Sequence, residues 1–225
     1  MPRPPARGPG HLVVVVATVP AAHLARSSRR WAGPSGVQGL SGRGVRVHPV
    51  CMTLASDDKV LILLRHAKAE QVLGKPDHDR ELTHRGERDA RAAGRWLHDH
   101  EIGAELVLCS DSTRTRQTWA AAVEGGACGE TVEFTPALYS GSAQAVLHAV
   151  REQGGEAQVV LVVGHNPTMA SLASGLAEGD GSSQAHECLA DGFPTSSLAV
   201  LRFAGNWQDL DFGTAVLERC HTARG

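Results

Sequence analysis

Close cysteine pairs are absent from this 225-residue sequence. Its five cysteines include no CxxC motif, so the sequence suggests neither a zinc knuckle nor a disulfide framework. That pattern is typical of a reducing compartment, and we expect a cytoplasmic location. The net charge of −2 disfavours a nucleic acid as the main partner. Ordinary proportions of apolar, charged, glycine and proline residues exclude collagen-like, coiled-coil and wholly disordered chains.

Acidic residues are absent from residues 1–52, which carry seven arginines and many prolines and glycines. Such a composition predicts a disordered basic extension. Its one apolar run, residues 12–19, is far shorter than the roughly 20 residues that a membrane-spanning helix needs. Two alternatives stay open: this run belongs to a secretory signal, or translation starts at Met52 and the extension is not part of the protein.

Strand and helix patterns alternate through residues 53–220, which we assign to one domain. Continuous apolar runs at residues 60–64, 105–109 and 159–163 are typical of strands covered on both faces. Helical spacing follows Thr83, and further helices are expected at residues 113–123, 142–153 and 168–176. Additional strands are expected at 132–134 and 197–203, a polar loop at 178–187, and a frayed end from 211. The alternation predicts a three-layer α/β/α sandwich with a mostly parallel central sheet.

Histidines and arginines follow the three core strands. Arg65 and His66 come directly after the first run, Arg114 opens the helix after the second, and His165 follows the third. Ligands of open α/β sheets bind beyond the carboxyl ends of the strands, so these side chains should converge. Arginine forks match phosphate oxygens, and a neutral histidine can attack phosphorus. A second histidine, if protonated, would stabilise the charge on a phosphoryl group in transfer.

Three segments carry a family resemblance. LLRHAKAE, SDSTRTRQT and VVGHNP, in this order, resemble the motifs of the histidine phosphatase superfamily, which has the phosphoglycerate mutase-like fold, and most closely its SixA-like branch of phosphohistidine phosphatases. The resemblance implies that His66 is the nucleophile and that His165 completes the catalytic pair. It also implies that Arg65 and Arg114 bind the phosphoryl oxygens, and that neither a metal nor a cofactor is needed.

Two departures from the superfamily pattern bear on the substrate. Ala67 stands where the wider superfamily has glycine, and residues 137–144 (ALYSGSAQ) offer no carboxylate where the mutase branch has a proton-donating glutamate. An imidazole leaving group is stable once neutral, so we expect phosphohistidine in proteins as the substrate. The alternatives are a phosphomonoesterase of small molecules and a non-catalytic phosphate-binding module. The expected partner is a phosphorylated protein or a small phosphate ester, with no nucleic acid and no membrane, and the expected state is a monomer.

Three further sets of residues are candidates for the site. The charged residues 77–80 either reach over the site or form a solvated loop. Glu70 is the carboxylate nearest in sequence to the first motif if an acid is required. The hydroxyls of residues 195–197 either line the pocket or serve in turns and caps.

Overall fold

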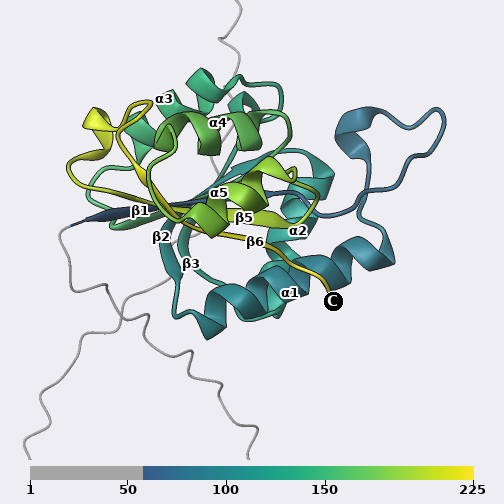
Figure 1. The fold of residues 1–225 in the computed structure, drawn as a ribbon. Coiled ribbons are helices and arrows are strands. Elements are labelled where there is room, and N and C mark those ends of the chain that lie inside the picture. Colours follow the sequence, from purple (N-terminus) through teal and green to yellow (C-terminus); the bar gives the residue numbers. More distant parts are fainter. Residues whose placement is uncertain (1–57) are drawn as a thin grey trace, which may run out of the picture. The chain divides into compact units, whose positions relative to one another are not determined.

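The computed structural model describes residues 58–225, which form one six-stranded sheet with helices on both faces (Figure 1). The expected basic extension of residues 1–52, and with it the signal and start-site alternatives, lies outside the described residues. The strands are β1 (Lys59–Arg65), β2 (Gly103–Ser110), β3 (Cys128–Thr135), β4 (Val159–Gly164), β5 (Ser197–Phe203) and β6 (Val216–Thr222).

The sheet has the strand order β3-β2-β4-β1-β5-β6. The first four strands in sequence are parallel to one another, whereas β5 runs antiparallel to both β1 and β6. In the register of β1 and β4, Arg65 lies opposite Gly164, so the two strands end side by side. The residues that follow these strands are therefore brought together at one edge of the sheet.

Helices cover the two faces unequally. The helices α1 (His84–Asp99) and α2 (Thr113–Glu124) pack on one face, with a core that includes Ile62 and Leu64. The other face packs against α3 (Ala143–Gln153), α4 (Thr168–Ala177) and α5 (Ser183–Ala190), with a core that includes Leu61 and Leu63. Successive β1 residues thus enter opposite cores, because side chains alternate along a strand. The three-layer sandwich predicted from the sequence is confirmed.

The close contact between α1 and α2 depends on a glycine. A Cβ atom at Gly94 would collide with the backbone carbonyl of Ala122 in α2. The small residues of this helix therefore serve helix–helix packing as well as packing on the sheet. At the start of α1 the hydroxyl of Thr83 accepts a hydrogen bond from the Gly86 amide at 3.1 Å, so Thr83 is the N-cap residue that the sequence predicts.

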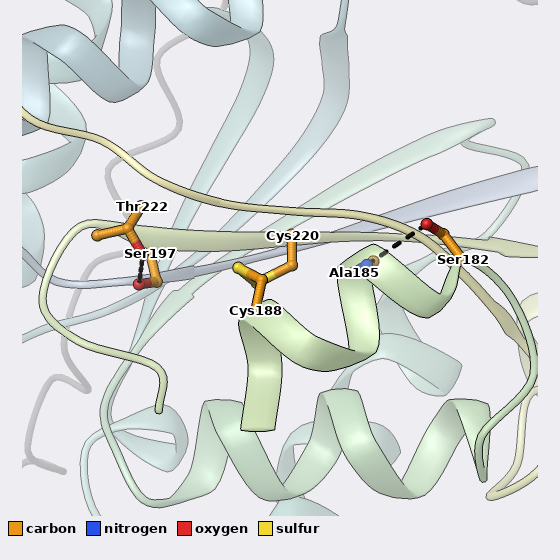
Figure 2. The surroundings of a disulfide bond; sticks show 6 residues. All are labelled: Ser182, Ala185, Cys188, Ser197, Cys220 and Thr222. Atoms are coloured by element: carbon orange, nitrogen blue, oxygen red, sulfur yellow. Dashed lines mark hydrogen bonds between the residues drawn. A yellow bond between two sulfur atoms is a disulfide. The ribbon is translucent and has the colours of Figure 1, made fainter. Parts of the chain in front are cut away.

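Two expectations for the C-terminal part of the domain are wrong. The expected polar loop contains α5, which Ser182 caps by accepting from the Ala185 amide, and the expected frayed end contains β6 (Figure 2). The pattern of β6 is weak because it is an edge strand, with β5 as its neighbour in the sheet, and six of its seven residues are partly or fully exposed. Pairing with β5 rather than local periodicity therefore determines this strand.

A disulfide joins these two elements. Cys188 of α5 and Cys220 of β6 are bonded, with their Cα atoms 5.9 Å apart (Figure 2). The cysteine spacing, which suggests no disulfide framework, does not indicate this single bond, because the two residues are 32 positions apart and meet only once α5 packs on β6. The cytoplasmic location inferred from cysteine spacing stays a prediction. None of the helices in residues 58–225 has the length and apolar character to cross a membrane.

Residues 58–225 also contain three 3-10 turns, namely η1 (Asp77–Asp79), η2 (Pro136–Leu138) and η3 (Trp207–Asp209). The turn η1 lies in the long connection between β1 and α1, which projects from the body of the domain (Figure 1). The turn η2 follows β3 and leads into α3. Both η1 and η2 contribute to the surroundings of the candidate site.

Candidate active site

The four residues expected to form a phosphate pocket come together at the carboxyl edge of the sheet. The rings of His66 and His165 lie 5.1 Å apart between centroids, at an angle of 57°. Arg65 ends β1 and Arg114 lies in the first turn of α2, and the charges of both arginines lower the pKa of both histidines. The convergence predicted from strand ends is thus present in the structure, whereas the chemical roles of these residues stay predictions.

The backbone and one hydrogen bond set the orientation of His66. Its amide donates to Gly164 O at 2.9 Å, and its carbonyl accepts from the Ser196 amide at 3.2 Å. The ring atom Nδ1 lies 2.8 Å from Ala67 O. Because a carbonyl only accepts, Nδ1 carries the proton and Nε2 keeps its lone pair. Burial and the charges of the two arginines lower the pKa of His66 to about 4, so its ring is neutral near pH 7.

His165 is almost fully buried, and its Nε2 forms a hydrogen bond of 2.9 Å with the hydroxyl of Ser110 at the end of β2. Burial lowers the pKa of His165 to about 3, and positive charge at His66 and Arg114 would act in the same direction. The protonated second histidine considered from the sequence is therefore not the form present without a bound anion. The neutral ring can still donate through Nδ1 when Nε2 accepts from Ser110.

The two arginines are held by oxygen atoms of distant loops. Arg65 Nη1 donates to Phe193 O at 2.7 Å. Arg114 donates through Nη1 to Asp77 O at 2.6 Å and through Nη2 to Asp77 Oδ2 at 2.9 Å. Neither set of bonds uses Nε, so each guanidinium keeps a buried N–H for another acceptor.

Buried polar atoms without a hydrogen-bond partner are concentrated here. Within residues 58–225, six buried side-chain atoms lack a partner, and five belong to residues in or beside this pocket. They are Arg65 Nε, Arg114 Nε, His165 Nδ1, Asn166 Oδ1 and Ser196 Oγ. Native proteins satisfy most buried polar groups, so this cluster indicates a site built to contact a ligand. Because the cluster includes unpaired N–H groups of two permanent cations, the ligand that fits is an anion.

Several residues around the pocket are not assigned a role by the sequence. The loop of residues 77–80, for which two readings were open, does reach the site, because Asp77 contacts Arg114. Tyr139, in the segment noted only for its missing carboxylate, donates its hydroxyl to Asp77 Oδ2 at 2.7 Å. Its ring meets His165 edge-on at 5.5 Å. Only the folded chain brings these residues together, since η1 and η2 are far apart in sequence.

The remaining candidates divide between the site and the scaffold. Glu70 is paired with Lys75, which holds the pKa of Glu70 below its usual range, and it is not bonded to either histidine. Ser196 belongs to the site, because its amide binds His66 O and its buried hydroxyl lacks a partner. Ser197 instead bonds the hydroxyl of Thr222 and joins β5 to β6 (Figure 2). Nowhere in residues 58–225 do three or more His, Cys, Asp or Glu side chains form a group that could hold a metal ion.

Comparison with known proteins places this geometry in a family. A model of the histidine phosphatase superfamily (branch 1) matches residues 61–140. An uncharacterized protein of Mycobacterium tuberculosis (strain H37Rv) is 39% identical over 163 residues, which are 72% of this chain and 100% of the relative. A candidate SixA phosphohistidine phosphatase from Nakamurella multipartitia is 36% identical, with a TM-score of 0.64 over 74% of this chain and 96% of that one. A second such candidate, from Agrobacterium tumefaciens, is 30% identical, with a TM-score of 0.58 over 72% of this chain and 97% of that one. The chain belongs to the histidine phosphatase superfamily, in its SixA-like branch.

Proposed function

We propose that this protein is a phosphatase that forms a phosphohistidine on His66 and acts on phosphohistidine in other proteins. The observation that carries the proposal is the hydrogen bond from His66 Nδ1 to Ala67 O. It leaves the Nε2 lone pair available beside two arginines, at a ring whose pKa lies well below neutrality. A nucleophile needs such a free lone pair, and a module that only binds phosphate needs the arginines alone.

The proposed reaction has two steps. Arg65 and Arg114 bind the phosphoryl oxygens, and His66 Nε2 forms a bond to phosphorus while the bond to the leaving nitrogen breaks. The electron pair of that bond stays on the departing nitrogen, and a proton already carried by the other nitrogen of the substrate ring makes the product a neutral imidazole. Water then attacks phosphorus, the bond to Nε2 breaks, and inorganic phosphate leaves, with the water proton passing to solvent. Donation from His165 Nδ1 would stabilise the phosphoryl oxygens in both steps.

The ionised state of Asp77, the carboxylate bound to the pocket residue Arg114, supports the proposal of a substrate whose leaving group needs no acid from the enzyme. Residues 137–144 contain no carboxylate, and Asp77 comes instead from the loop before α1. Hydrogen bonds from Tyr139, Arg80 and Arg114 hold the pKa of Asp77 far below its usual range, so it has no proton to donate near pH 7. An alkoxide leaving group would need that proton, whereas a phosphohistidine ring that is protonated on its other nitrogen departs as neutral imidazole without one. The similarity to candidate SixA phosphohistidine phosphatases agrees with this choice.

A labelling experiment tests the proposal. The full chain is incubated with a peptide carrying ³²P-phosphohistidine and quenched in alkali, and the labelled residue is identified by mass spectrometry. We expect label on His66, release of inorganic phosphate, and loss of both in His66→Ala. The matched control is His148→Ala, which removes an exposed histidine of α3 and should retain full activity.

A substrate panel separates the alternatives. Faster turnover of phosphohistidine than of phosphoserine, phosphotyrosine or p-nitrophenyl phosphate is expected. Faster turnover of small esters, with no turnover of the phosphohistidine peptide, would favour a small-molecule phosphomonoesterase. Binding of phosphate without turnover of any compound would favour a non-catalytic module and contradict the proposed phosphatase.

A further inference from the structure

The Arg114 guanidinium is held at one end by a single residue. Arg114 Nη1 and Nη2 donate to the carbonyl and to the carboxylate of Asp77, at 2.6 and 2.9 Å. The side chain of Arg114 is 7% exposed, and its Nε is buried without a partner. A guanidinium is planar and has five N–H groups, so it can be bound at its Nη end and still present the Nε edge to a second acceptor.

Asp77 is itself fixed by two side chains, one at the end of its own turn and one from a distant segment. Arg80 Nη1 donates to Oδ1 at 2.7 Å, and the Tyr139 hydroxyl donates to Oδ2 at 2.7 Å. Arg80 is anchored in turn, because its Nε donates to Glu70 O at 2.7 Å. Both carboxylate oxygens are therefore engaged, and their direction toward Arg114 is set before any ligand binds.

The turn that carries Asp77 is also attached to the loop from which Arg114 emerges. His78 Nε2 lies 3.0 Å from Asp111 Oδ1, and Asp111 stands between β2 and α2. The His78 ring packs edge-on against Tyr139 at 4.9 Å between centroids. These contacts connect η1 to the start of α2. The distance between the Arg114 guanidinium and Asp77 therefore stays constant.

From this arrangement we infer that Asp77 is a positioning residue, which holds the Nη end of Arg114 so that its Nε edge faces the phosphoryl group. The inference rests on the proposed function and adds to it a residue outside the four-residue pocket. Asp77 acts through Arg114 and makes no contact with phosphorus. Tyr139 and Arg80 support it by fixing the carboxylate.

A competing role for the Asp77 carboxylate predicts the opposite effect of its removal on anion binding. If the Asp77 carboxylate occupied the place of a substrate oxygen on Arg114, its removal would free the guanidinium and strengthen anion binding. If Asp77 positions Arg114, its removal weakens binding, because the guanidinium loses its fixed direction. A displacement of about 1 Å at a reacting group lowers rates by about 100-fold, which sets the scale of the expected effect.

The experiment measures inorganic phosphate affinity by titration calorimetry, and kcat and KM with a phosphohistidine peptide, for the full chain. Asp77→Ala is expected to lower phosphate affinity and to lower kcat/KM by about 10- to 100-fold. Asp77→Asn, which keeps an acceptor oxygen and the shape of the side chain, should show an intermediate loss and keeps the test valid if the alanine variant does not fold. Asp79→Ala is the matched control, since Asp79 lies in the same turn, is exposed, and has its carboxylate near His78 rather than bonded to Arg114.

A double-mutant cycle asks whether Asp77 works through Arg114. In an Arg114→Ala background, Asp77→Ala should change phosphate affinity by no more than about twofold, because the group that Asp77 holds is gone. Full additivity in this cycle, or tighter phosphate binding by Asp77→Ala, overturns the inference. If the wild-type protein binds and hydrolyses while Asp77→Ala behaves like Asp79→Ala, only this inference fails. If the wild-type protein does neither, the proposed function itself fails.

Discussion

The ring of His66 lies 5.1 Å from the ring of His165, although the two residues follow different strands of the sheet. The parallel pairing of β1 with β4 produces this relationship, because Arg65 and Gly164 end the two strands in register. A shift of one residue in that pairing would turn alternate side chains to the other face and separate the rings. The geometry of the candidate site is therefore a property of the sheet.

Nuclear magnetic resonance can test the neutral state of both rings. The pKa values of His66 and His165 should lie near 4 and 3, below the ordinary value of 6.5, because both rings are buried beside arginines. Addition of inorganic phosphate should raise both values, since an anion between the rings favours their charged forms. A ring that titrates near 6.5 without phosphate would contradict the burial and charge argument.

The same shifts predict how stability changes with pH. The unfolded chain binds protons at these two histidines as the pH falls through about 6.5, whereas the folded protein does not until the pH approaches 4. The free energy of unfolding should therefore decrease as the pH falls from 6.5 to 4 for both histidines, and on to about 3 for His165. Urea unfolding at several pH values should show a smaller decrease for His165→Asn than for the wild type. Equal decreases in the free energy of unfolding for the variant and the wild type would mean that His165 does not contribute to the pH dependence of stability.

Arg65 can be tested apart from Arg114. Removal of its guanidinium in Arg65→Ala should lower kcat/KM by about 100- to 1000-fold, the usual cost of losing one donor to transition-state charge. Arg65→Lys should recover little, because an ammonium group cannot bind both Phe193 O and a phosphoryl oxygen as a planar fork does. Arg202→Ala, which removes an arginine paired with Asp58 and Glu218, should leave kcat/KM unchanged.

The packing of α1 on α2 predicts a large effect from one methyl group. Gly94→Ala would place a Cβ against the carbonyl of Ala122, so the helices must separate. We expect the free energy of unfolding to fall by about 1–3 kcal/mol, measured by chemical denaturation. Arg95→Ala, at the exposed neighbouring position, should change it by less than about 0.5 kcal/mol. An unchanged free energy of unfolding in Gly94→Ala would show that the two helices can move apart at this contact without loss of stability.

The disulfide should stabilise the folded domain. It closes a loop of 32 residues, and Cys188→Ser should lower the free energy of unfolding by about 2–4 kcal/mol. Dithiothreitol should reduce the wild type to the stability of the variant and leave the variant itself unchanged. Cys128→Ser is the control, because Cys128 is a free cysteine in β3. Equal stability of oxidised and reduced wild type would mean that α5 and β6 hold together without the bond.

Local sequence is sufficient for the central strands, for the cap at Thr83, for the positions of Arg65, His66 and His165 at strand ends, and for Arg114 in the first turn of the helix after β2. Apolar runs and capping residues act over a few positions, so they can be interpreted without the fold. Tertiary structure alone decides the contact of Asp77 with Arg114 and Tyr139, the edge strand β6, and the pairing of Cys188 with Cys220. Each of these joins residues far apart in the chain, and a polar or half-exposed segment carries no periodicity that would identify its partner before the sheet has formed.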